Sequence, residues 1–70
     1  MPDVRELVVK NAALVLGKTL VEVDDQTHLN GGQYRLVVMN VNMMTGRAIR
    51  LKPEGGTVGE IVAATQAAGR

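Results

Sequence analysis

The clearest pattern of apolar and polar positions lies near the end of the chain. Apolar residues and one threonine recur at spacing i, i+3, i+4 and i+7 from Val58 to Thr65, which is one stripe of a helix. Thr57 and Glu60 have the spacing of a capping box, in which each side chain satisfies the other residue's backbone N–H. The pattern predicts a helix over residues 57–68.

A β-hairpin is expected before this helix. Residues 34–41, YRLVVMNV, are dense in Tyr and β-branched side chains, which favour strands. Thr45-Gly46 can supply a turn in which Gly46 takes the left-handed position of a three-residue bulged loop. In that register Met39 and Val41 face apolar residues of the next strand. One side of the hairpin is then apolar and the other mostly polar, as a half-buried sheet requires.

Asn30-Gly31 is a second hairpin signal and would pair the segment TLVEVDDQTHL with QYRLVVMNV. The first sixteen residues allow two interpretations. Asp3 and Glu6 can cap a helix that ends at Gly17. The valines of this segment favour instead a strand over residues 5–9, and we favour the strand.

Together these patterns predict a single α+β domain over residues 1–70. We expect a small antiparallel β-sheet of three to five strands, with the C-terminal helix packed on one face. Apolar residues make up 46% of the chain, yet Tyr34 is its single aromatic residue and it has no Cys. Such side chains bury less area than aromatic ones do, so we expect another chain to cover part of the apolar surface.

The charge is uneven along the sequence, although the formal net charge is only +1. Residues 1–30 carry three basic and five acidic side chains, whereas residues 31–70 carry five basic and two acidic ones. A chain with such a division can associate with copies of itself, acidic end to basic end. A solvated surface of mixed charge is the alternative.

The segment VVMNVNMMTGRAIRLKPEGGTVGEIVAATQAAG, residues 37–69, resembles the first half of a ubiquitin-like β-grasp domain. The resemblance lies in the order strand, turn, strand and capped helix, with Met44-Thr45-Gly46-Arg47 at the turn. It implies a β-grasp-like fold and protein binding through a sheet face.

Two other segments are similar to acyl and peptidyl carrier proteins. ALVLGKTLVEVDDQTHLNGG is similar to their first helix and loop, and GGTVGEIVAA is similar to their last helix. Carriers need a Ser for the phosphopantetheine arm, and this sequence has none. Carrier chemistry is therefore excluded, while a carrier-like fold remains an alternative.

No pattern of catalytic residues stands out. The sequence has neither Ser nor Cys as a nucleophile, and its threonines have no recognisable activating motif. Asp24, Asp25 and His28 could hold a metal, but three ligands on one short loop are a weak signal. We expect a protein that is not an enzyme and that uses no cofactor or metal.

The expected function is structural: a small self-associating subunit, or a component of a larger complex such as a virus particle. In the predicted sheet, Tyr34, Leu36 and Val38 share the face away from the helix and are the candidate interface. The expected partners are copies of the chain or other protein subunits.

Two alternatives remain open. One is a ubiquitin-like protein-interaction module. The other is a nucleic-acid-binding β-ribbon, whose candidate contacts are Arg35, Arg47, Arg50 and Lys52. The sequence shows neither a signal peptide nor a transmembrane run, so we expect an intracellular location or one within a virus particle, with no membrane partner.

Overall fold

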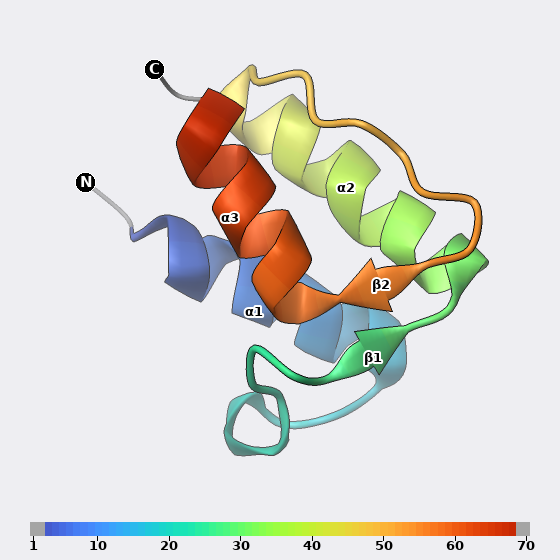
Figure 1. Ribbon diagram of the computed structural model, residues 1–70. Coiled ribbons are helices and arrows are strands. Elements are labelled where there is room, and N and C mark those ends of the chain that lie inside the picture. Colours follow the sequence, from blue (N-terminus) through green and yellow to red (C-terminus); the bar gives the residue numbers. More distant parts are fainter. Residues whose placement is uncertain (1–2, 69–70) are drawn as a thin grey trace.

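The computed structural model describes residues 3–68, which form three α-helices and one two-stranded antiparallel sheet (Figure 1). The elements follow in the order α1 (Val4–Leu16), a 3-10 turn η1 (Leu20–Glu22), β1 (His28–Leu29), α2 (Gly31–Thr45), β2 (Gly56–Thr57) and α3 (Val58–Ala68). Residues 1–2 and 69–70, which include the ends of the predicted domain and of the ubiquitin-like segment, lie outside this description.

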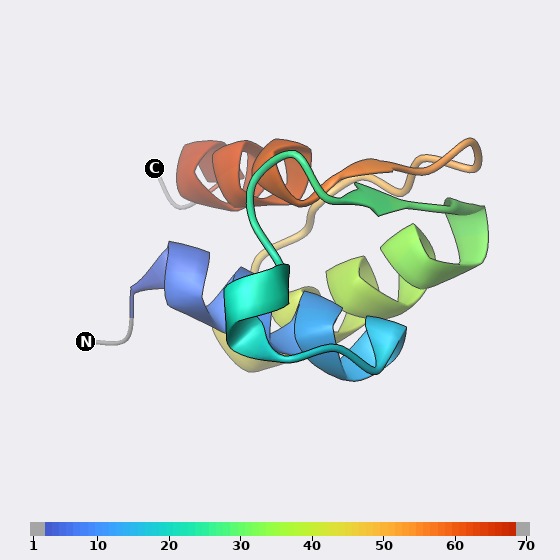
Figure 2. The same ribbon diagram turned by 90° about the horizontal axis from the view of Figure 1, so that it is seen from below.

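The elements form two layers (Figure 2). Helices α1 and α2 pack together in one layer, and α3 lies with β1 and β2 in the other. Helix α1 contacts both other helices. In the sheet His28 pairs with Thr57 and Leu29 with Gly56, so the strands join the entry of α2 to the entry of α3.

The predicted sheet of three to five strands is wrong, because residues 34–41 lie inside α2. Tyr34, Val37, Val38 and Val41 are buried, and they recur at i, i+3, i+4 and i+7. The segment therefore carries a helical stripe as well as strand-forming residues. Burial of these four side chains outweighs the weak preference of valine for strands.

The two predicted hairpin turns, Asn30-Gly31 and Thr45-Gly46, lie at the two ends of α2. Asn30 caps the start of the helix: its Oδ1 accepts the N–H of Gln33 at 2.9 Å, and Gln33 Oε1 accepts the N–H of Asn30 at 2.9 Å. Gly46 ends the helix with a φ of 71°. A glycine in the left-handed region serves a bulged hairpin loop and a helix C-terminus equally well.

The strand favoured at residues 5–9 is also wrong, because this segment belongs to α1. Asp3 Oδ1 accepts the N–H of Arg5 at 3.1 Å and caps the helix. Gly17 ends it with a φ of 68°. The helical alternative is therefore the one that forms.

The C-terminal helix is confirmed as α3. Thr57 N–H donates to Glu60 Oε2 at 2.6 Å, and Glu60 N–H donates to Thr57 Oγ1 at 3.3 Å, which is the predicted capping box.

Residues 46–55 form an extended connection that runs beside α2 (Figure 1). Asn42 on α2 holds it in place, since its Oδ1 accepts the N–H of Ile49 at 2.9 Å and its Nδ2 donates to the Ile49 carbonyl at 3.4 Å. A Cβ on Gly31 would overlap the carbonyl oxygen of Pro53. This close approach requires glycine at the start of α2.

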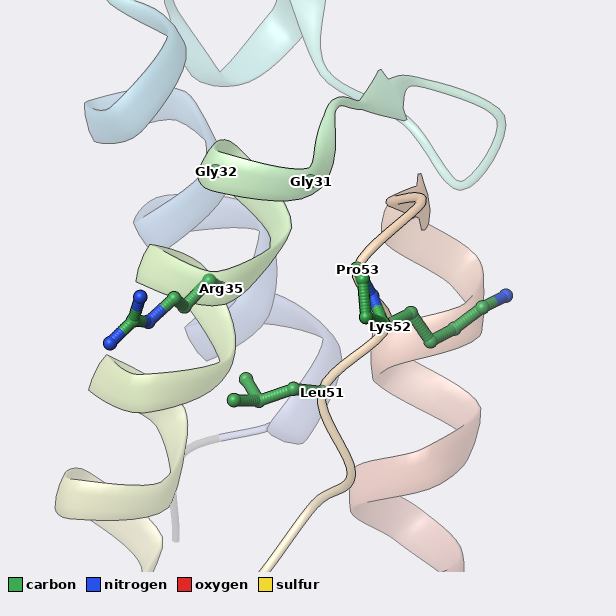
Figure 3. A pocket seen from close by; sticks show the side chains of 6 residues that line it. All are labelled: Gly31, Gly32, Arg35, Leu51, Lys52 and Pro53. Carbon is green, nitrogen blue, oxygen red and sulfur yellow. The ribbon is translucent and has the colours of Figure 1, made fainter.

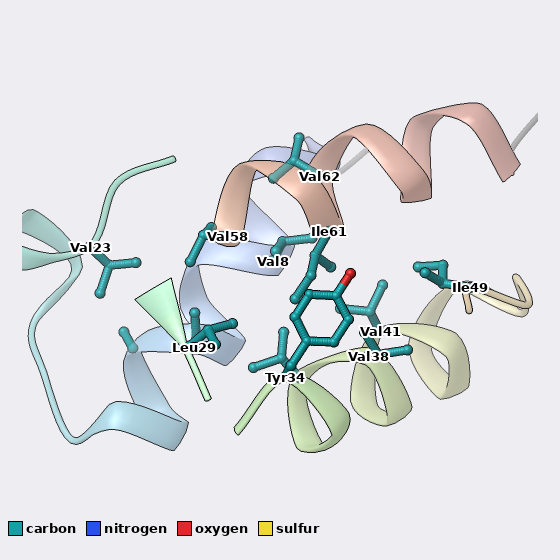
Figure 4. Packing of buried hydrophobic residues seen from close by; sticks show 13 residues of the cluster. Val8, Val23, Leu29, Tyr34, Val38, Val41, Ile49, Val58, Ile61 and Val62 are labelled. Atoms are coloured by element: carbon teal, nitrogen blue, oxygen red, sulfur yellow. The ribbon is translucent and has the colours of Figure 1, made fainter. Parts of the chain in front are cut away.

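Buried residues from every layer form one core (Figure 4). Tyr34 and Val38 point from α2 into it, and Ile61 enters from α3. The members are Val8, Ala12, Ala13, Val23, Leu29, Tyr34, Val37, Val38, Val41, Ile49, Val58, Ile61 and Val62. Met39, which the predicted hairpin register placed on the apolar side, is exposed instead.

Candidate binding face on helix α2

The outer side of α2 carries large apolar side chains in contact with solvent. Leu36 is 54% exposed, Met39 is 47% exposed and Met43 is 79% exposed. Their spacing of i, i+3 and i+7 places them in one row opposite the buried side of the helix. We call Leu36, Met39 and Met43 the α2 stripe. A helix normally turns such a row toward the core, so this row is an apolar surface without a partner among residues 3–68.

The α2 stripe lies in a part of the chain without carboxylates. From Gly31 to Pro53 the sequence has four cationic side chains and neither Asp nor Glu. Arg35 lies on α2 beside the stripe, and both Arg35 and Arg50 are exposed. Neither forms a salt bridge with another residue between 3 and 68. The face therefore combines an apolar row with Arg35 at its edge, in a segment without negatively charged side chains.

A groove of about 350 Å³ lies beside the stripe, between the first turns of α2 and the connection. It is lined by Gly31, Gly32, Arg35, Leu51, Lys52 and Pro53 (Figure 3). Leu51 points from the connection toward α2, whereas Lys52 points away from it. Arg35 lies about one helical turn before Met39, so one side chain of the groove is next to the stripe, although Leu36, Met39 and Met43 do not line the groove.

The three residues predicted as an interface do not share a face. Tyr34 and Val38 are 2% and 0% exposed and belong to the core, so placing them on an outer surface was wrong. The error follows from the predicted strand, in which alternate residues point the same way; in a helix they lie on different sides. Leu36 alone of the three is exposed, and it belongs to the α2 stripe.

The four residues proposed for nucleic-acid binding lie on α2 and the connection, and the β-ribbon that was to carry them does not form. Arg47 Nη1 donates to the Thr65 carbonyl at 2.9 Å, and Lys52 Nζ donates to Glu60 Oε1 at 2.5 Å. Two of the four cations thus have partners inside the chain. Tyr34 is buried, so its ring is not available to stack on a base.

Lys52 is central to the electrostatics beside the groove. Its hydrogen bond to Glu60 raises the pKa of the lysine and lowers the pKa of the glutamate. The lysine Nζ also lies 6.0 Å from the centre of the Tyr34 ring. Burial raises the pKa of the Tyr34 hydroxyl, against the opposing effect of the lysine charge. These contacts hold the connection beside α3, and they leave Arg35 and Arg50 as the exposed cations of residues 31–53 without a salt bridge to another residue between 3 and 68.

A second exposed apolar site lies in the segment from Thr19 to Asn30, far along the chain from the α2 stripe. Val21 is 95% exposed, and its neighbour Leu20 is half exposed. We call these two residues the η1 knob. The segment carries Glu22, Asp24 and Asp25, but Leu20 also lines a groove of about 370 Å³ together with Lys10 and Lys18. Charges of both signs therefore lie near the knob.

The weak metal signal gains no support within the described chain. Among residues 3–68, no group of three or more His, Cys, Asp or Glu side chains is arranged to hold a metal ion. Asp25 is instead paired with Arg5, which lowers the pKa of the aspartate. In the same part of the chain, every helix is too short or too polar to cross a membrane.

Sequence reasoning missed Met39 and Met43 as surface residues. Two features of the sequence could have predicted the helix and thereby these surface residues. They are the capping pair Asn30 and Gln33 and the helical spacing of the apolar residues that follow it. Once α2 is a helix, both methionines fall opposite that row.

Comparison of the chain with protein-family models, with curated proteins and with solved structures gives no match. Function is therefore inferred from the chemistry of the surface itself.

Proposed function

We propose that this chain is a non-catalytic assembly module that binds a protein surface through the α2 stripe. The observation that carries the proposal is the row of Leu36, Met39 and Met43 in a segment of 31–53 that contains cations and no carboxylate. Methionine suits adaptable binding surfaces, because its unbranched side chain and polarizable sulfur fit irregular contours.

The partner surface follows from the same chemistry. An apolar ridge would cover the stripe and remove its side chains from water. A carboxylate at the edge of that ridge would lie near Arg35, where opposite charges favour encounter and fix orientation. An amphipathic helix with leucines on one face and glutamates beside them has both features. The α2 stripe is thus expected to bind an acidic, amphipathic protein segment.

A designed peptide of this kind tests the proposal. Labelled with a fluorophore, it should bind the protein at low salt, with anisotropy rising as protein is added. Met43→Glu places a carboxylate in the stripe and should weaken binding at least tenfold. Ala63→Glu adds the same charge at an exposed site on α3 and should leave binding unchanged.

The proposal fails if the peptide does not bind at millimolar protein and low salt. It also fails if Met43→Glu and Ala63→Glu bind the peptide as the parent does. Binding of a DNA oligonucleotide in preference to the peptide, weakened by Arg35→Ala and Arg50→Ala, would support the nucleic-acid alternative instead.

A further inference from the structure

The three methionines between residues 3 and 68 lie outside the hydrophobic core, on the second half of α2. Met43 is 79% exposed, Met44 is 62% exposed and Met39 is 47% exposed. The sequence has no Cys, so methionine carries all of its sulfur. Methionine commonly fills gaps in a core. Here the thioether groups are instead open to solvent, and the core that holds the fold contains none of them.

An exposed thioether reacts with a peroxide. A lone pair of the sulfur attacks one oxygen of hydrogen peroxide, the O–O bond breaks, and the other oxygen leaves as water after proton transfer. The sulfur loses two electrons and becomes a sulfoxide, while the peroxide is reduced to water. The reaction converts an apolar, flexible side chain into a polar one.

This change falls on the surface proposed to bind the partner. Met39 and Met43 are two of the three side chains of the α2 stripe, which would be covered by an apolar ridge. A sulfoxide oxygen buried against such a ridge would lose its hydrogen bonds to water without gaining a donor. Neither methionine belongs to the core, so the same oxidation leaves the fold intact. Oxidation would therefore remove binding without unfolding the chain.

Met44 differs from the two stripe methionines in its surroundings. Its sulfur accepts a hydrogen bond from Asn11 Nδ2 at 3.7 Å, on the side of α2 that meets α1. The hydrogen bond engages a lone pair of the sulfur, and a lone pair is what attacks the peroxide. Met44 should therefore be oxidised more slowly than Met43, which is also more exposed.

We infer that Met39 and Met43 form a peroxide-responsive modification site, at which oxidation releases the partner of the α2 stripe and reduction restores binding. This inference rests on the proposed binding role of the stripe. The reverse step needs a methionine sulfoxide reductase and two thiols, which become a disulfide while the oxygen leaves as water. A bound partner covers both sulfurs and so slows their oxidation.

Graded treatment with hydrogen peroxide, followed by its removal, tests the inference on the whole protein. The acidic peptide is made without methionine and is added afterwards, and mass spectrometry of fragments locates each added oxygen. Sulfoxide should form at Met43 before Met44, with no change in melting temperature. Affinity for the peptide should fall by about tenfold or more once Met39 and Met43 are both oxidised. Treatment with the two sulfoxide reductases and dithiothreitol should restore it.

Two controls separate the stripe from the other methionines. The loss of affinity should follow the sulfoxide fraction at Met39 and Met43 and not that at Met1 or Met44. Met44→Leu should therefore lose affinity on treatment as the parent does. Saturating peptide, present during a second treatment, should slow oxidation at the two stripe positions more than at Met44.

The inference is overturned if protein oxidised at both stripe positions binds as untreated protein does. It is also overturned if the loss follows Met44, or if oxidation of the stripe lowers the melting temperature. When untreated protein binds the peptide and oxidised protein binds it equally well, the modification site is wrong while the binding role of the stripe stands. When untreated protein does not bind, the proposed function itself fails and the inference falls with it.

Discussion

The carboxylate of Glu60 accepts two hydrogen bonds from different parts of the chain. Lys52 Nζ lies 2.5 Å from its Oε1, and the N–H of Thr57 lies 2.6 Å from its Oε2. One side chain therefore caps α3 and holds the connection that lines the groove beside α2. The stability of the fold therefore depends on whether Glu60 is charged or protonated.

The first prediction concerns pH. The ammonium of Lys52, and after it the N–H of Thr57, lowers the pKa of Glu60 below its ordinary value of 4.5. Folding therefore favours the charged carboxylate, so its contribution to stability is present above the ordinary pKa and is lost as pH falls through the lowered pKa of the folded protein. Glu60→Gln should melt at a lower temperature than the parent at neutral pH, and the difference should shrink in acid.

Thermal melts across the acid range check this prediction. Glu54→Gln is the matched control, because Glu54 is exposed and forms no salt bridge with another residue between 3 and 68. Parallel pH profiles for the parent and Glu60→Gln would show that the carboxylate does not stabilise the fold.

The second prediction concerns Asn42. Asn42→Ala removes the side-chain partner of both backbone groups of the buried Ile49. The free energy of unfolding should fall by about 1–2 kcal/mol, the cost of leaving a buried N–H unsatisfied. Asn40→Ala on the exposed side of the same helix should change it by no more than about 0.5 kcal/mol. Urea melts that give equal values for the two variants would contradict the role of Asn42.

The third prediction separates core from surface on α2. Val38→Asp buries a charge at a position with no exposure, and in a chain of this size it should prevent folding at room temperature. Leu36→Asp places the same carboxylate in the α2 stripe and should leave the fold intact while weakening peptide binding about tenfold or more. Circular dichroism checks folding, and anisotropy checks binding. A folded Val38→Asp variant, or a Leu36→Asp variant with the affinity of the parent, would be inconsistent with the structure of α2.

The sequence predicted α3 correctly because its local signals agree. The capping box of Thr57 and Glu60, the apolar stripe and the alanine-rich composition all favour helix. For α2 the local signals disagree. Its valines favour a strand, and its flanking glycines suit hairpin turns as well as helix ends. The spacing of Tyr34, Val37 and Val38 favours a helix, and packing against α1 decides between the two.

The candidate site was predictable only in part. The division of charge was visible in the sequence, and so was the expectation of apolar surface left uncovered. Which residues are exposed depends on whether α2 is a helix or a strand, because the two periods place Leu36 and Val38 differently. Of the expected interface residues, Leu36 is therefore on the surface as predicted, whereas Tyr34 and Val38 lie in the core.

The most direct test of the binding face is NMR of the methionine methyl groups in ¹³C-methyl-labelled protein. Met39 and Met43 lie in the α2 stripe, whereas Met44 lies closer to α1, with its sulfur 3.7 Å from Asn11 Nδ2. As the acidic peptide is added, the methyl signals of Met39 and Met43 should shift together and more than that of Met44, and Met43→Glu should abolish the shift at Met39. Peptide binding that leaves the signals of Met39 and Met43 unmoved would contradict the assignment of α2 as the binding face.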